Sequence, residues 1–180
     1  HPHLLEENMQ LYIGALQNLG VFKFRLKKFD ELEDLLGKMR SLKVSSFVQK
    51  SNVFYWTAVR ELDLYIATGR LKEGISRIDY FQNHLSVYND SGLPRAEVNL
   101  LYFNIAVLYF SSGDYSAANK YLNIILNDNE LDLRVDIYSF AKILSLIVHF
   151  ELGNEDLLPY LIKSTYRFLL KRNRLYRFET

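Results

Sequence analysis

Residues 102–126 constrain the fold most strongly, because they follow the pattern of two amphipathic helices joined by a tight turn. Apolar side chains recur at helical intervals on both sides of Gly113. Glycine suits such a turn, since it adopts left-handed backbone conformations without steric cost. Ala117 and Ala118 place small side chains where the second helix must approach the first. We therefore predict a helical hairpin with its turn at Gly113.

This hairpin resembles a tetratricopeptide repeat (TPR), whose pattern is W-x-x-L-G-x-x-Y followed by A-x-x-x-F. The residues at the six pattern positions are Tyr102, Ile105, Ala106, Tyr109, Ala118 and Leu122. Glu130 replaces the Pro that usually closes the pattern. The resemblance implies a helical surface that binds another protein and carries out no catalysis.

Equivalents of the turn recur along the whole chain, at Gly69 and Gly153 and, near the N-terminus, at Lys27 in place of glycine. The residues two positions after each turn are Phe29, Leu71, Tyr115 and Glu155. They lie 42, 44 and 40 residues apart, which is longer than the usual TPR spacing of about 34. We predict four repeats, at residues 4–42, 45–90, 95–130 and 133–178.

The predicted fold is all-α, a right-handed α-α superhelix (TPR-like solenoid) of about four hairpins and eight helices. A single domain is expected to cover residues 1–180. The helices are expected at residues 4–26, 29–40, 45–68, 71–88, 95–111, 114–127, 133–151 and 156–176. Asp114 and Asp156 are predicted N-caps, and Pro159 then falls in the first turn of the last helix.

Composition narrows the functional classes. The net charge of +1 argues against a dedicated nucleic-acid binder. The chain has no cysteine, which excludes disulfides and thiolate metal sites and fits the cytoplasm. No apolar run reaches the roughly 18 residues of a membrane span. Because the chain begins with His1 and lacks an initiator Met, we expect it to be a fragment of a longer protein.

The resemblance also implies a partner-binding groove, because the first helix of each TPR pair lines the concave face. The apolar and aromatic residues that we assign to this groove are Trp56, Phe103, Val107, Phe110, Phe140, Ile143, Ile147 and Phe150. Such a surface is typical of a docking site for an amphipathic helix or apolar peptide of unknown identity. The alternative is that these side chains are core or are covered by another segment.

A second candidate surface is the last helix, where Lys163, Arg167, Lys171 and Arg174 share one stripe. The opposite side, expected to face the core, carries Leu158, Leu161, Ile162, Thr165, Phe168, Leu169 and Tyr176. A basic face suits an anion-binding module for nucleic acid or acidic membrane. The alternative is a solvated cap at the end of a solenoid.

Motifs for catalysis or metal binding are incomplete. Gly69 and Gly74 have the spacing of a phosphate loop, but Ile75 stands where lysine is required. Asp128, Glu130 and Asp132 alternate as in a calcium loop, but Leu133 and Ser139 replace its Gly and Glu.

The remaining polar residues are expected in structural or solvated positions. The carboxylates expected on solvated helix faces are Glu31, Glu33, Asp34, Glu61 and Asp63, and His84 and His149 are expected in structural roles. We therefore predict no enzymatic activity, cofactor or metal. The expected function is a protein interaction scaffold, with a structural or homodimerising spacer as a further alternative.

Overall fold

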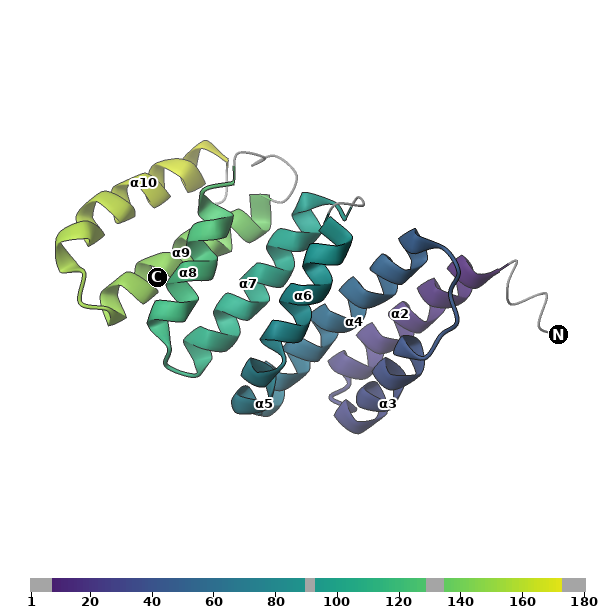
Figure 1. The fold of residues 1–180 in the computed structure, drawn as a ribbon. Helices are drawn as coiled ribbons and strands as arrows, with labels where there is room; N and C mark the ends of the chain where they lie inside the picture. The colour runs from purple at the N-terminus through teal and green to yellow at the C-terminus, as the bar shows by residue number, and fades with distance from the viewer. Residues whose placement is uncertain (1–7, 90–92, 129–134, 173–180) are drawn as a thin grey trace. The chain divides into compact units, whose positions relative to one another are not determined.

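The computed structural model describes residues 8–89, 93–128 and 135–172, and every regular element in these ranges is a helix (Figure 1). The elements are α2 (Met9–Arg25), α3 (Phe29–Arg40), α4 (Phe47–Thr68), α5 (Leu71–Ser76), α6 (Ile78–Asn89), α7 (Arg95–Ser111), α8 (Tyr115–Leu126), α9 (Val135–Glu151), the 3-10 helix η1 (Glu155–Leu157) and α10 (Leu158–Lys171). The prediction of an all-α fold is confirmed for this part of the chain.

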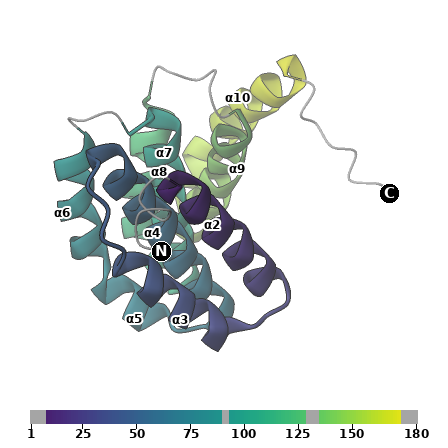
Figure 2. The same ribbon diagram turned by 90° about the vertical axis from the view of Figure 1, so that its right-hand side faces the viewer.

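The chain divides into two compact units, a first unit His1–Leu101 and a second unit Tyr102–Thr180. The division lies inside α7, and each unit has its own packing. In the first unit α2, α3 and α4 contact one another, and in the second unit α9 contacts both α8 and α10 (Figure 2). The prediction of a single repeat domain over residues 1–180 stays a prediction.

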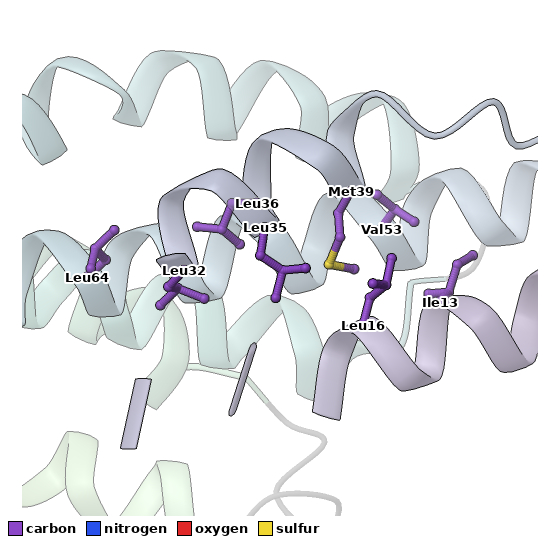
Figure 3. Close-up of a cluster of buried hydrophobic side chains, with 8 residues drawn as sticks. All are labelled: Ile13, Leu16, Leu32, Leu35, Leu36, Met39, Val53 and Leu64. Atoms are coloured by element: carbon purple, nitrogen blue, oxygen red, sulfur yellow. The ribbon is translucent and has the colours of Figure 1, made fainter. Parts of the chain in front are cut away.

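The core of the first unit forms where α3 packs against α2 and α4. Buried residues of α3 recur at intervals of three and one, from Leu32 to Met39, so they form one apolar stripe. The cluster contains Ile13, Leu16, Leu32, Leu35, Leu36, Met39, Val53 and Leu64 (Figure 3). Full burial of each such side chain contributes roughly 1.5–3 kcal/mol to folding. The stripe therefore holds α3 between its two neighbours.

The second unit packs around α9, whose buried face carries small side chains. Ser139, Ala141 and Ser145 are buried, and small residues let neighbouring helices approach closely. On α8, the predicted small position Ala118 is also fully buried. Tyr121 of α8 stacks on Tyr109 of α7 with ring centroids 5.7 Å apart, which joins α7 to α8.

The four predicted turns have one backbone geometry. The turn residues Lys27, Gly69, Gly113 and Gly153 have φ values of 56°, 71°, 82° and 70°. Each turn residue donates its N–H to the carbonyl three residues earlier, at 3.0–3.3 Å. The residue after each turn has φ between −78° and −86° and ψ between 51° and 76°, and the next helix follows at once. At Lys27, Gly113 and Gly153 the next N–H also bonds the carbonyl five residues before it, which makes these three turns Schellman endings.

Two local predictions are wrong. The helix expected at 71–88 is interrupted at Arg77, which separates α5 from α6. Gly74 weakens the helix just before this point, and the Arg77 side chain is held by Glu61. Asp156 is not the N-cap of the last helix, because it lies within η1 and α10 begins at Leu158.

Other local predictions are confirmed. The Asp114 carboxylate accepts a hydrogen bond from the Ala117 N–H at 2.9 Å, as an N-cap does. Pro159 lies in the first turn of α10. The start of the first predicted helix, the end of the last one, and Glu130, Asp132 and Leu133 of the calcium-like pattern fall outside the described residues.

Lys27 allows a direct test of the shared turn, because it is the one non-glycine with positive φ among the described residues. We expect Lys27→Gly to raise the free energy of unfolding by about 1 kcal/mol, since the Cβ strain of the left-handed conformation is removed. Urea denaturation measures the change. The control is Lys28→Gly, which has negative φ and should lower stability. A destabilised Lys27→Gly variant would contradict the turn geometry.

Candidate functional site

One exposed apolar surface of the second unit lies on α9. Phe140, Ile147 and Phe150 are 52%, 43% and 62% exposed, and Ile143 between them is half-buried. Successive members are three or four residues apart, so the four side chains share one side of the helix. We call them the α9 apolar face. Because the opposite side of α9 is buried in the unit, this helix is apolar on two sides.

The predicted groove residues of α7 lie beside this face. Phe103, Val107 and Phe110 are half-buried and share one stripe of α7. The Phe103 ring lies 6.5 Å from the Phe140 ring, measured between centroids. The ring of Phe110 is partly covered by that of Tyr115, 5.6 Å away. The structure therefore brings Phe103 of α7 and Phe140 of α9, two members of the predicted groove, together.

Trp56 belongs to the packing of the first unit. It is half-buried and packs against the core cluster. A Cβ atom on Gly20 of α2 would overlap the Trp56 indole, so α2 approaches α4 closely at this point. This packing accounts for the position of Trp56, and its role in partner binding stays a prediction.

The basic stripe of the last helix is exposed where the structure describes it. Lys163, Arg167 and Lys171 are solvent-exposed on α10, and Arg174 and Tyr176 lie outside the described residues. Thr165 and Leu169 are buried as predicted. Leu158, Leu161 and Phe168 are partly buried.

The expectation that Ile162 faces the core is wrong, because it is 54% exposed. Ile162 lies at the edge of the buried stripe. Tyr166 and Leu170, four and eight residues later, lie on the same side of the helix and are equally exposed. The outer side of α10 therefore carries an apolar stripe next to a basic one.

Glu61 is the clearest error about the charged residues. It was expected on a solvated face, but it is buried on α4 between neighbouring elements. Its carboxylate accepts hydrogen bonds from Arg40, from Arg77 Nε at 3.1 Å and from the Tyr65 hydroxyl at 3.0 Å. Burial, aided by the Glu61 charge, raises the pKa of Tyr65 to about 12. Glu61 of α4 is therefore linked to Arg40 of α3 and to Arg77 at the junction between α5 and α6.

The two described histidines make local hydrogen bonds. His149 lies 3.0 Å from the Asn154 amide nitrogen, which donates to its Nδ1. His84 donates from Nδ1 to the Tyr80 carbonyl at 2.9 Å. Within the described ranges, no three His, Cys, Asp or Glu side chains are grouped to hold a metal ion. Nor is any helix in these ranges long and apolar enough to cross a membrane.

Comparisons with known proteins give no functional lead. A scan against protein-family models gave no match, and searches of curated proteins and of solved structures gave none either. The functional argument therefore depends on the chemistry of the surfaces described above.

The Glu61 network predicts a large stability effect. We expect Glu61→Gln to lower the free energy of unfolding by about 3 kcal/mol, because the Arg40 and Arg77 guanidinium groups lose their shared counter-charge. Urea denaturation followed by circular dichroism measures the change. The matched control is Glu73→Gln: Glu73 is exposed and lies 3.6 Å from Arg70, so its loss should cost about 0.5 kcal/mol. Equal stability of Glu61→Gln and the wild type would contradict the network.

Proposed function

We propose that the protein is a non-catalytic protein–protein interaction scaffold. On this proposal, the α9 apolar face and the adjoining α7 residues bind an amphipathic helix or apolar segment of a partner protein. The observation that carries the proposal is the exposure of Phe140, Ile147 and Phe150 on a helix whose other side is already buried. Contiguous exposed apolar surface of this kind typically marks an interaction site.

The spacing of these side chains suits a helical ligand. Recognition of an amphipathic helix uses apolar contacts spaced three, four and seven residues apart. The α9 apolar face offers contacts at the same intervals, and Phe103, Val107 and Phe110 extend it across α7. An aromatic side chain left in water loses part of the roughly 1.5–3 kcal/mol that its burial contributes. A partner that covers Phe140 and Phe150 recovers that free energy.

The proposed scaffold is a TPR-like right-handed superhelix of about four hairpins. Support comes from the shared backbone conformation of the four turns and from their spacing of 42, 44 and 40 residues. Successive helices also pack together at α2–α3 and α3–α4 of the first unit and at α8–α9 and α9–α10 of the second. Recurring hairpins that bury a common seam are the general design of helical repeat proteins.

The α9 apolar face is tested by the double variant Phe140→Ser and Phe150→Ser. We expect partner binding to be lost while the free energy of unfolding changes by less than about 1 kcal/mol, because both rings are mostly in water. Affinity capture identifies the partner, and titration with the purified partner then measures binding. The control is Phe22→Ser, which removes a ring on α2 that is 59% exposed and should leave binding unchanged. Unfolding of the double variant, or unchanged binding, would contradict the proposal.

A second candidate function is attachment to acidic membranes through α10. The observation that favours it is the apolar stripe of Ile162, Tyr166 and Leu170 beside the basic stripe of Lys163, Arg167 and Lys171. A helix with adjacent apolar and basic faces lies in the interface of an anionic bilayer. Phosphate contact alone would not use the apolar stripe, so membrane is favoured over nucleic acid. A structural or homodimerising spacer is the third alternative, which light scattering on the intact chain addresses.

The membrane alternative predicts a steep charge dependence. Each basic residue near an anionic surface contributes about 1 kcal/mol, so replacing Lys163, Arg167 and Lys171 with Glu should weaken vesicle binding by at least roughly a hundredfold. Co-sedimentation with phosphatidylcholine vesicles, with and without phosphatidylserine, measures this. The charge-matched control replaces the exposed residues Lys38, Lys72 and Lys120. Equal losses in both triple variants, or binding without phosphatidylserine, would rule out the α10 site.

A further inference from the structure

The first unit contains a pocket that the proposed function does not use. It has a volume of about 260 Å³ and is lined by the end of α3, the connection that follows it, α4 and α6. Sites for drug-sized ligands usually measure about 300–1,000 Å³. This pocket is therefore sized for one large side chain or ring.

One wall of the pocket is aromatic and held in place by its own contacts. Tyr80, His84 and Tyr88 follow one another at four-residue intervals on α6. The Phe54 ring of α4 stacks on His84 at 5.4 Å and contacts Tyr88 at 5.3 Å. His84 in turn contacts the Tyr80 ring at 4.1 Å. These rings present a preformed surface on which an aromatic or large apolar side chain can pack.

The rest of the pocket is positively charged. Among the described residues that line it, Arg40, Lys43 and Lys50 are cations and none is a carboxylate. The Arg40 and Arg77 guanidinium groups share the single carboxylate of Glu61, which leaves one net positive charge beside the pocket. Lys43 and Lys50 are exposed and add two more. The site therefore combines an aromatic wall with an excess of positive charge.

We propose that this pocket binds an acidic segment of a partner protein, which packs one large apolar or aromatic side chain against the wall formed by Phe54 and the α6 rings. Carboxylates next to that side chain then contact Arg40, Lys43 and Lys50. The proposal rests on the function proposed above and adds a second contact of defined chemistry. A protein segment is favoured over single-stranded nucleic acid, because nucleic-acid sites need an extended basic track and repeated stacking surfaces.

The probe is a fluorescein-labelled acidic peptide with glutamates around one central tryptophan, titrated into the intact protein and followed by fluorescence anisotropy. Replacing the tryptophan with alanine should weaken binding at least about tenfold, because the side chain that fills the pocket is lost. Replacing the glutamates with lysines should abolish binding. The peptide should also shift the ring resonances of His84 in NMR spectra and leave those of His149 unchanged.

Variants of the protein distinguish the effect of charges that line the pocket from the effect of the net charge on peptide binding. Lys43→Glu with Lys50→Glu should weaken binding by roughly tenfold or more. The control Lys72→Glu with Lys120→Glu changes the net charge equally at exposed positions outside the pocket. At physiological ionic strength it should change the affinity by less than about twofold, because charges farther apart than about 8 Å are screened. All four lysines are exposed, so folding should be retained.

Four results would overturn the inference. These are no binding of the tryptophan peptide, equal affinity for its alanine form, equal losses in the two charge variants, and tighter binding of a single-stranded oligonucleotide that is lost in Lys43→Glu with Lys50→Glu. Failure of the function proposed above gives a different result. That result is unchanged partner capture in Phe140→Ser with Phe150→Ser. Peptide binding to the pocket stays intact in this variant, because these residues lie outside the pocket.

Discussion

The left-handed turn at the end of each first helix is the constraint on which the hairpins depend. At each turn the backbone N–H groups are redirected onto the last carbonyls of the finished helix, and the chain reverses within two residues. The reversal places the next apolar stripe against the previous helix. Lys27 shows the strength of this constraint, because it adopts a positive φ that glycine adopts at the other three turns. Packing of the stripe on α3 offsets the strain at Lys27.

Hairpins of this kind bury one stripe of each helix, but they do not determine the environment of the remaining side chains. α9 buries Ala141 and Val148 and still presents Phe140 and Phe150 to solvent. On α4, Glu61 is buried, and its charge is neutralised by two arginines from neighbouring segments. Apolar surface that is exposed to water and charged groups that are buried away from water both lower the stability of the fold. We interpret the first as a binding surface and the second as a structural link that also shapes the charge of the pocket.

Local predictions from the sequence were correct where interactions between neighbouring residues determine the structure. Gly113 predicts a turn through its freedom at positive φ, and Asp114 predicts a cap through a hydrogen bond three residues away. Errors arose where distant segments meet. The predicted helix is interrupted at Arg77, whose side chain is hydrogen-bonded to Glu61, sixteen residues earlier. Tyr80, His84 and Tyr88 recur every four residues on α6, and the sequence shows this spacing. Only the structure shows that the Phe54 ring of α4 stacks on His84.

The all-α class of the described residues, the four turns and the polarity of most helix faces could therefore be predicted from the sequence. These follow from backbone preferences and helical periodicity, which act over a few residues. Tertiary structure alone decided that Glu61 is buried, that Ile162 is exposed and that Arg40, Lys43 and Lys50 surround one pocket. Burial depends on which helix covers which face, and that is a property of long-range packing, since one amphipathic pattern is compatible with several neighbours.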